Sequence, residues 1–206
     1  MVKTCGISGG SGAGKTTLTR HLVERLGADQ VSVVAFDAYY RDQGHLTPVD
    51  RALVNYDHPD SLDHEMFAAD VETLRSGRAV ASPVYDFSTH TRTAEVKVIE
   101  PKPVVIVEGI LLLSFPEIAA HLDLAVFIDV PEQVRLDRRI TRDVAERGRE
   151  PNDVRRQFAA TVAPMHNQYV EPFRHVAHRT VELHEKYGPV ADELIERLTV
   201  PERLVG

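Results

Sequence analysis

The sequence is constrained most by a glycine-rich run at residues 9–16, which reads G-G-S-G-A-G-K-T. This run fits the pattern G-x-x-x-x-G-K-[ST], which chance would produce in a sequence of this length with odds of about 1 in 100. A β-rich run precedes it at residues 2–8, and a helical pattern follows it at residues 15–26. Successive backbone N–H groups can wrap a phosphate only if side chains stay out of the way, and the helix start adds partial positive charge. The run therefore predicts a phosphate-binding loop between a strand and a helix.

The polar residues at the end of this loop indicate the ligand. Lys15 can bridge the outer phosphates of a nucleotide, and the hydroxyl of Thr16 can bind Mg²⁺. We therefore expect a nucleoside triphosphate with magnesium, although the motif alone does not name the reaction. A switch GTPase would also need D-x-x-G and N-K-x-D patterns, and the sequence contains neither. The predicted nucleotide-binding residues are Gly9, Gly10, Ser11, Gly12, Ala13, Gly14, Lys15, Thr16 and Thr17.

The surrounding pattern predicts the fold class. Further β-rich runs lie at residues 31–36, 104–107 and 124–130, and a second helical pattern begins near Glu132. Strands that alternate with helices at this spacing predict an α/β fold, with a parallel sheet covered by helices on both faces. Residues 104–107 are apolar at every position, so they should form an inner strand of that sheet.

Two segments interrupt this alternation. Residues 79–87 and 92–99 are β-rich and flank a polar turn, which predicts a β-hairpin inserted at about residues 79–99. Residues 41–64 are rich in His, Asp and Pro and predict a long, mostly irregular connection, a kind of segment that is usually functional. Since no repeat or linker is visible, we predict one domain over residues 1–206.

Composition excludes several kinds of partner. The chain has 24 basic and 31 acidic residues, a formal charge of −7, so a general nucleic-acid or anionic-membrane surface is not expected. The single cysteine, Cys5, excludes an intrachain disulfide and a cysteine-based zinc cage. No signal segment is visible, and the longest apolar stretch, residues 104–113, is about half the length that spans a bilayer. These features predict a soluble, cytoplasmic protein.

Two carboxylates follow predicted strands. Asp37 comes after the run at residues 31–36 and Glu108 after the run at residues 104–107, so both should emerge at the sheet edge where the phosphate loop opens. Phosphoryl transfer needs a carboxylate to receive a proton and others to hold Mg²⁺. We assign Asp37 as the base and Glu108 as a metal-side ligand; the alternative is that acidic residues commonly end strands in loops.

Arginines are concentrated in the second helical pattern: eight of them lie between Arg135 and Arg156, among five acidic residues. The apolar stripe of this helix is Leu136, Ile140 and Val144, and the basic stripe is Arg135, Arg139 and Arg142. We expect the apolar stripe to pack and the basic stripe to face anions, as a lid at about residues 131–150 with a hinge near Gly148. The alternative is a solvated charged face with ion pairs such as Arg138 with Asp143.

From about residue 3 to residue 172 the sequence resembles the uridine/cytidine kinases of the P-loop kinase group. The phrases that carry the resemblance, in addition to the loop, are Phe36-Asp-Ala-Tyr-Tyr-Arg41, Asn55-Tyr-Asp-His-Pro-Asp60, Pro83-Val-Tyr-Asp-Phe-Ser-Thr-His-Thr-Arg92, Val107-Glu-Gly-Ile-Leu111 and Arg138-Arg-Ile-Thr-Arg-Asp-Val-Ala-Glu-Arg-Gly-Arg149. The resemblance implies a three-layer P-loop kinase fold with a parallel central sheet, an inserted β-hairpin and an arginine-rich lid. The chain departs from the family at residues 176–188, where members usually carry a strand and an Arg-Gly-Gly type loop.

By this resemblance, residues can be assigned to roles. The implied catalytic residues are Asp37, Lys15, Arg142 and Arg147, and the implied metal-side residues are Thr16, Glu108 and Asp37. The implied substrate-binding residues are Tyr40, Asp57, Tyr85, Phe87, His90, Arg139, Arg149 and Gln157. Their chemistry agrees, because Asp57 can accept from ribose hydroxyls, aromatic rings can form walls for a pyrimidine, and His90 can donate or accept. Alternatively, Tyr85 and Phe87 are the buried face of the hairpin and His90 is a turn residue.

The resemblance implies transfer of the γ-phosphoryl group of ATP (or GTP), with Mg²⁺, to the 5′-hydroxyl of uridine and cytidine, which gives UMP and CMP. The protein would bind a small-molecule nucleoside and a nucleotide, and it would bind neither nucleic acid nor a membrane. Family resemblance also implies a homo-oligomer, a tetramer. Two other hypotheses remain: a phosphoribulokinase-like or pantothenate-kinase-like enzyme, and a nucleotide-binding regulator without catalysis. The regulator would lack a base or a metal carboxylate, and Asp37 and Glu108 are both present.

Overall fold

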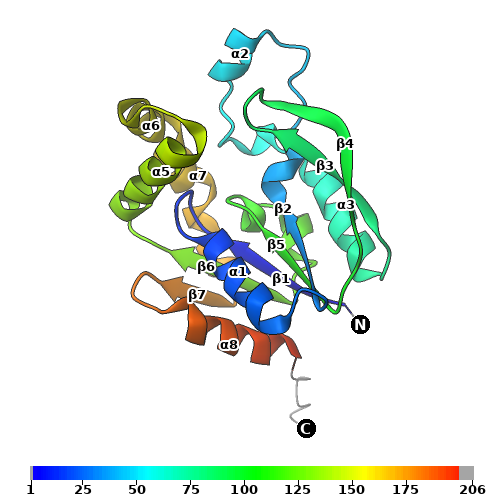
Figure 1. Ribbon diagram of the computed structural model, residues 1–206. Helices are drawn as coiled ribbons and strands as arrows, with labels where there is room; N and C mark the ends of the chain where they lie inside the picture. Colours follow the sequence, from blue (N-terminus) through cyan, green and yellow to red (C-terminus); the bar gives the residue numbers. More distant parts are fainter. Residues whose placement is uncertain (1, 200–206) are drawn as a thin grey trace.

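A five-stranded parallel sheet forms the centre of the computed structural model, which describes residues 2–199 (Figure 1). Its strands are β1 (Lys3–Ser8), β2 (Val31–Ala35), β5 (Val104–Glu108), β6 (Leu124–Asp129) and β7 (Arg179–Glu182). They lie in the order β2-β5-β1-β6-β7, and every neighbouring pair is parallel. The predicted apolar strand, β5, is an inner strand between β2 and β1. The α/β fold class and the parallel sheet are thus confirmed.

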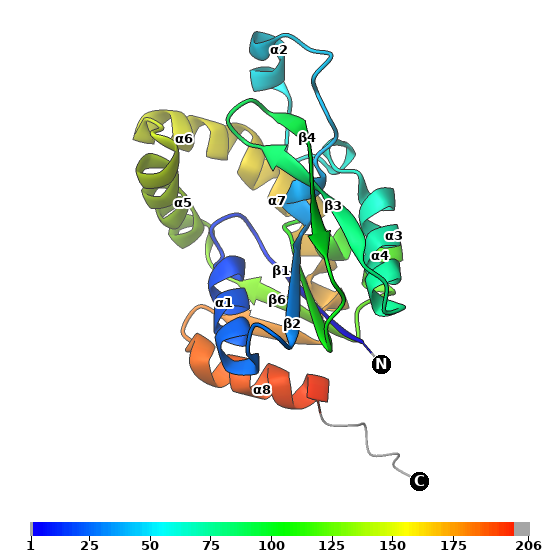
Figure 2. The same cartoon turned by 45° about the vertical axis from the view of Figure 1, so that its right-hand side comes forward.

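Helices cover both faces of this sheet. On one face lie α1 (Lys15–Leu26) and α8 (Tyr187–Thr199), and on the other lie α3 (His64–Arg75) and α4 (Pro116–Ala119) (Figure 2). Strand β5 shows why the layers form, because its side chains alternate between the two faces. Val104 and Ile106 pack in the cluster with α1 and α8, whereas Val105 and Val107 pack in the cluster with α3. Helix α3 was not predicted from the sequence.

The insertion is an antiparallel hairpin of β3 (Val80–Asp86) and β4 (Thr91–Ile99), with a register shift between Pro83 and Tyr85. The connection before α3 carries only the short helix α2 (Pro48–Leu53) and a single turn at Pro59–Ser61. The hairpin and α2 stand on one side of the carboxyl end of the sheet (Figures 1 and 2). Among residues 2–199, no helix is long and apolar enough to cross a membrane.

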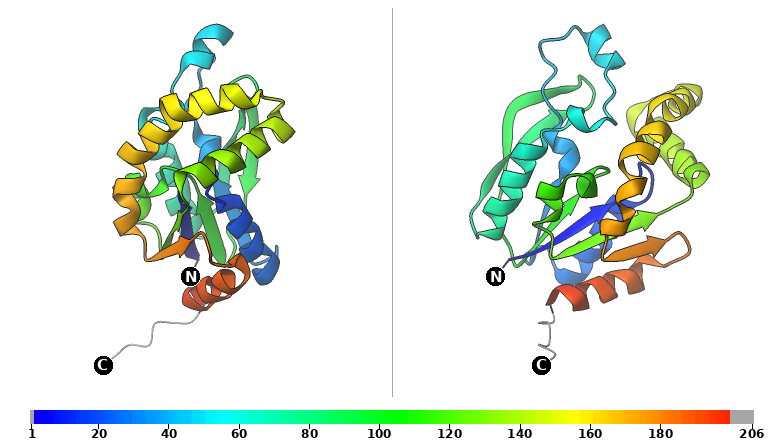
Figure 3. Two further views of the ribbon diagram at one scale, coloured as in Figure 1. Left: turned by 90° about the vertical axis from the view of Figure 1, so that its left-hand side faces the viewer. Right: turned by 180° about the vertical axis from the view of Figure 1, so that it is seen from behind.

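On the opposite side of that sheet end lie three helices, α5 (Glu132–Arg147), α6 (Pro151–Gln157) and α7 (Ala163–Tyr169). Helices α6 and α7 are joined by a π-helical stretch at Phe158–Val162, and they run on as one helical arm, yellow to orange, above α5 in Figure 3, left. The site residues therefore sit on two separate parts of the chain, the hairpin side and the α5–α7 side, with the phosphate loop between them.

The buried face of α5 differs from the prediction. Arg135, Arg139 and Asp143 are buried, whereas Val144 is 39% exposed and Ile140 is half-buried. Only Leu136 of the apolar stripe packs against an apolar cluster, that of Phe158, Val162 and Ala163. The reason is that α5 packs against polar backbone and side-chain atoms of the phosphate loop, which need donors and not methyl groups. The predicted pair of Arg138 with Asp143 is also wrong, since Arg138 donates to the Ala13 carbonyl at 3.0 Å.

Candidate active site

The phosphate loop connects β1 to α1 at the carboxyl end of the sheet, as the motif predicts. The Lys15 ammonium turns back over the loop and donates to the carbonyls of Gly9, at 2.9 Å, and Gly10, at 3.2 Å. Burial lowers the pKa of Lys15, and the charges of Asp37 and Glu108 act in the opposite direction. Lys15 therefore lies within the electrostatic reach of both predicted carboxylates.

Neighbouring helices pack closely against the phosphate loop, and this packing is a second reason why the loop needs glycines. Gly12 has a φ of +82°, and a Cβ atom there would overlap the backbone oxygen of Arg135 at the start of α5. Gly14, at a φ of +108°, would place a Cβ atom against the hydroxyl of Tyr187. That hydroxyl donates to the Ala13 carbonyl at 3.1 Å. Glycine is thus required both for backbone conformation and for close contact with α5 and α8.

Glu108 lies beside the loop at the end of β5 and accepts two hydroxyl hydrogen bonds. Thr16 Oγ1 donates to its Oε1 at 3.0 Å, and Thr19 Oγ1 donates to its Oε2 at 2.8 Å. No group of three or more His, Cys, Asp or Glu side chains that could hold a metal occurs among residues 2–199. This donor set fits Mg²⁺ bound with a nucleotide, because Mg²⁺ usually takes one or two protein oxygens, with phosphate and water completing its shell.

Asp37 lies in the single helical turn Phe36–Tyr39 that follows β2. Its Oδ1 is buried and has no hydrogen-bond partner among the described residues. A buried carboxylate oxygen without a donor is unusual in a folded protein, because it costs free energy unless a group outside the chain satisfies it. Asp37 is therefore available to accept a hydrogen bond, or a proton, from a bound molecule.

A cleft of about 920 Å³ extends from Asp37 between the hairpin side and the α5–α7 side. All eight predicted substrate-binding residues line it: Tyr40, Asp57, Tyr85, Phe87, His90, Arg139, Arg149 and Gln157. Arg142 and Arg147 line it too, and Ser11 is the phosphate-loop residue that reaches it. The structure thus brings together residues that are as many as 146 positions apart in the chain, from Ser11 to Gln157.

Aromatic side chains form the hairpin side of the cleft. The Tyr85 and Phe87 rings lie edge to face, 5.2 Å between centroids, and Tyr40 packs against Tyr85 at the same centroid distance. The imidazole of His90 stacks on the Tyr56 ring, with centroids 4.5 Å apart and planes 13° from parallel. Burial, followed by the charges of Arg147 and Arg51, lowers the pKa of His90. The shift favours the neutral ring, in which one nitrogen donates and the other accepts.

Asp57 and Arg139 are buried residues of opposite charge that line the cleft. The Asp57 side chain is buried, and burial raises the pKa of its carboxyl although the charge of Arg139 lowers it. Arg139 donates to Ser11 Oγ at 3.0 Å and to Gln157 Oε1 at 3.2 Å. Arg149 donates to the same Gln157 oxygen at 2.8 Å. These groups present charged donors and an acceptor that suit a ligand carrying several hydroxyls.

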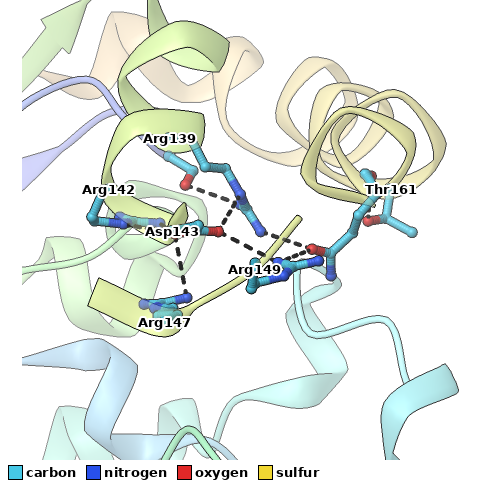
Figure 4. Close-up of polar contacts among 8 residues, drawn as sticks. Arg139, Arg142, Asp143, Arg147, Arg149 and Thr161 are labelled. Atoms are coloured by element: carbon cyan, nitrogen blue, oxygen red, sulfur yellow. Dashed lines mark hydrogen bonds and ion pairs between the residues drawn. The ribbon is translucent and has the colours of Figure 1, made fainter. Parts of the chain in front are cut away.

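Asp143 organises the arginines and was not predicted as a site residue. It is fully buried, and four arginines surround it: Arg139, Arg142, Arg147 and Arg149 (Figure 4). Arg142 binds it most closely, with Nε and Nη2 at 2.9 and 2.8 Å from Oδ1. The loop after α5 reaches the cluster because Gly148, at a φ of +61°, turns the chain back towards the helix.

Two further residues of the site were missed. Thr19 could have been found, because it lies three residues after Thr16 and hence on the same face of α1. Tyr56 carries no such signal, since its contact with His90 depends on how the hairpin packs against the preceding loop. Thr17, which was predicted to bind nucleotide, is exposed at the start of α1.

Comparisons with known proteins identify relatives of this fold and sequence. The model of the phosphoribulokinase/uridine kinase family matches residues 4–186. The chain is 47% identical over 176 residues to a uridine kinase of Shewanella halifaxensis, and the match covers 84% of this chain and 83% of the relative. A uridine kinase of Clostridium perfringens is 42% identical over 172 residues, with coverage of 84% and 83%.

Solved structures share the fold at lower sequence identity. A possible uridine kinase from Bacillus stearothermophilus has a TM-score of 0.61 and 18% identity, over 87% of this chain and 88% of that one. Phosphoribulokinase from Rhodobacter spheroides has a TM-score of 0.55 and 14% identity, over 82% and 68% of the two chains. At these identities the likeness is one of fold.

Proposed function

The chain belongs to the phosphoribulokinase/uridine kinase family, and we propose that it phosphorylates uridine with ATP. The observation that carries the proposal is the single cleft that joins Asp37 and Ser11 to the aromatic rings of the hairpin. Such a cleft suits an acceptor with a planar base at one end and a reactive hydroxyl at the other. We further propose that cytidine is a second acceptor and that the 5′-hydroxyl is the group phosphorylated.

The proposed reaction assigns a step to each part of the site. Asp37 accepts the proton of the acceptor hydroxyl while the oxygen of that hydroxyl bonds to the γ-phosphorus. The bond between that phosphorus and the bridging oxygen of ADP breaks in the same step. Lys15, Arg142 and Arg147 stabilise negative charge on the transferring group, which is the main catalytic contribution in this chemistry. Thr16 and Glu108 would hold Mg²⁺, which supplies charge neutralisation at the phosphates when bound.

The acceptor is held by the remaining cleft residues in this proposal. Asp57 accepts from the ribose hydroxyls, and Arg139 and Arg149 donate to them. The pyrimidine lies against Tyr85 and Phe87, within reach of His90. The lowered pKa of His90 favours its neutral form, and a neutral imidazole can meet either the 4-carbonyl of uridine or the 4-amino group of cytidine.

We propose that the base of the donor nucleotide binds in a second cavity, of about 390 Å³, next to the phosphate loop. Tyr187 and Arg138 both line it, and both donate to the carbonyl of Ala13 in the loop. A base attached to phosphates in the loop can therefore enter this cavity directly. The cavity is lined in part by residues 183 and 185–188, which belong to the segment that departs from the family pattern. The family therefore does not set the preference between ATP and GTP, and the ratio of the two binding affinities measures it.

We also propose that the chain acts as one kinase domain, in the cytoplasm, and as a homotetramer by family resemblance. The buried, unpaired thiol of Cys5 is compatible with a reducing compartment. Analytical ultracentrifugation of the purified protein measures the number of subunits in the oligomer.

The test is a nucleoside panel. Purified protein with Mg²⁺ and ATP is expected to form UMP from uridine and CMP from cytidine, detected by chromatography. Adenosine, ribulose 5-phosphate and pantothenate serve as competing acceptors, and EDTA should abolish turnover. Folded protein that phosphorylates another acceptor and neither pyrimidine nucleoside would overturn the proposal.

A further inference from the structure

The carboxylate of Asp143 is shared between two pairs of arginines, one pair on each oxygen (Figure 4). Oδ2 lies 3.5 Å from Arg139 Nε and 3.4 Å from Arg149 Nη1. Oδ1 lies 2.8 Å from Arg142 Nη2 and 3.7 Å from Arg147 Nη1. The first pair is assigned above to the acceptor, and the second pair to the transferring phosphoryl group.

The two pairs differ in how firmly the rest of the protein holds them. Arg139 and Arg149 are 9% and 30% exposed, and they share Gln157 Oε1. Arg142 and Arg147 are 36% and 41% exposed. Apart from Asp143, the described contacts of Arg147 include the face of the Phe87 ring at 5.6 Å, across the cleft on the hairpin. The pair on Oδ1 is therefore the more accessible to phosphate.

We propose that Asp143 is a positioning residue that couples the two substrate sites, an inference that rests on the proposed function. Phosphate oxygens of the donor compete with Oδ1 for Arg142 and Arg147, since guanidinium groups bind phosphate and carboxylate alike. The charge of Asp143 then acts more fully on Arg139 and Arg149 and holds them in the geometry that binds the acceptor. Nucleotide binding therefore tightens acceptor binding, and by linkage the acceptor tightens nucleotide binding by the same factor.

Burial makes this coupling strong. The Asp143 side chain has no exposed surface, so water screens its interaction with the four arginines less than it screens an ion pair at the surface. The cluster also carries an excess of positive charge, with four guanidinium groups around one carboxylate. An arriving triphosphate reduces that excess, which lowers the repulsion between the two pairs.

The test measures the uridine dissociation constant by calorimetry, with and without saturating AMP-PNP and Mg²⁺. In the wild-type protein AMP-PNP should lower this constant roughly fivefold or more, the lower end of typical coupling between sites. In Asp143→Asn the ratio should fall to within about twofold of one. The matched control is Asp137→Asn on the same helix, an exposed residue bonded to Gln133, which should keep the wild-type ratio.

A charge-balanced pair of variants covers the case in which Asp143→Asn does not fold. The double variant Asp143→Asn/Arg147→Met removes one charge of each sign, and it is compared with Arg147→Met alone. The single variant should retain a ratio clearly above two, because Arg142 still binds Oδ1, and the double variant should lose it. This difference separates coupling from folding, since a merely structural role would change the melting temperature without changing the ratio.

Two results would overturn the inference. A wild-type ratio near one, or an equal ratio in the paired variants while uridine still binds, would show that Asp143 does not couple the sites. If uridine does not bind the wild-type protein at all, even with AMP-PNP present, the proposed function fails as well. The two failures are thus distinguishable.

Discussion

Replacement of Asp57 by asparagine should stabilise the protein and weaken its proposed activity. Asp57 is 9% exposed, and burial raises the pKa of its carboxyl above the ordinary value despite the nearby charge of Arg139. A raised pKa means that the folded protein disfavours the ionised form relative to the unfolded chain. The asparagine side chain keeps the shape of the aspartate and removes the charge. The free energy of unfolding at neutral pH should therefore increase.

The sign of the pH dependence follows from the same shift. The stabilising contribution of a carboxyl whose folded pKa is raised is fully present below the unfolded pKa of about 3.9, and it is lost as pH rises through the folded pKa. The gain from Asp57→Asn should consequently be small near pH 4 and larger at pH 7.5. Each kcal/mol gained raises the melting temperature by roughly 2–4 °C in a domain of this size.

The same substitution should weaken the proposed activity. Hydrogen bonds to a charged acceptor contribute about 1.5–3 kcal/mol, so kcat/KM for uridine should fall roughly 10- to 150-fold. The assays are thermal melts at pH 4 and pH 7.5, together with initial rates at varied uridine. Asp60→Asn is the matched control, because that side chain lies in the same segment and is 92% exposed. A lower melting temperature at pH 7.5, or a gain that does not grow with pH, would refute the reasoning.

Other predictions concern single groups of the site. Asp37→Asn should lower turnover by roughly 10²–10⁴ while calorimetry shows ATP binding unchanged, whereas Lys15→Ala should weaken that binding as well. His90→Phe should change the uridine-to-cytidine ratio of kcat/KM by roughly tenfold, and an equal loss for both nucleosides would contradict a role in base selection. Burial would raise the pKa of Asp143, but hydrogen bonds and charge from Arg142 hold it below the ordinary value. Its stabilisation is present above pH about 3.9 and lost as pH falls through the lower folded pKa, so urea melts of Asp143→Asn should show less acid sensitivity there.

The sheet and the phosphate loop could be predicted because their signals are local. Helix α1 spans Lys15–Leu26, the range given by the pattern. The hairpin strands differ from their predicted bounds by one residue at both ends of β3 and at the start of β4, and the end of β4 agrees. Strand β5 could be placed inside the sheet because an uninterrupted apolar run has no side that tolerates water. Each of these elements is determined by a pattern within a short stretch of sequence.

The buried face of α5 could not be predicted in this way. Stripe arguments assume that the buried side of a helix is its apolar side, and here the partner is the phosphate loop. The side chains that contact the loop are therefore arginines, and Asp143 is buried among them. Arg149 joins this cluster from beyond the end of the helix, which depends on the turn at Gly148 and leaves no periodic signal.

Buried polar atoms in the cleft lower the stability of the unliganded protein and can strengthen the binding of a ligand. Asp37 Oδ1 is buried without a hydrogen-bond partner among the described residues, and Asp37 lines the cleft; Arg139 Nε also lacks a hydrogen bond there, but it lies 3.5 Å from Asp143 Oδ2. A buried polar atom that lacks a partner costs about 1–3 kcal/mol, and a hydroxyl-bearing ligand that satisfies it recovers that free energy on binding. An apolar cleft of the same volume would hold a ring equally well, but it would gain nothing from the hydroxyls that distinguish a nucleoside from a free base. Asp57 lines the same cleft, and its charged carboxylate is likewise costly to bury, so stability and the proposed activity should respond to Asp57→Asn in opposite directions.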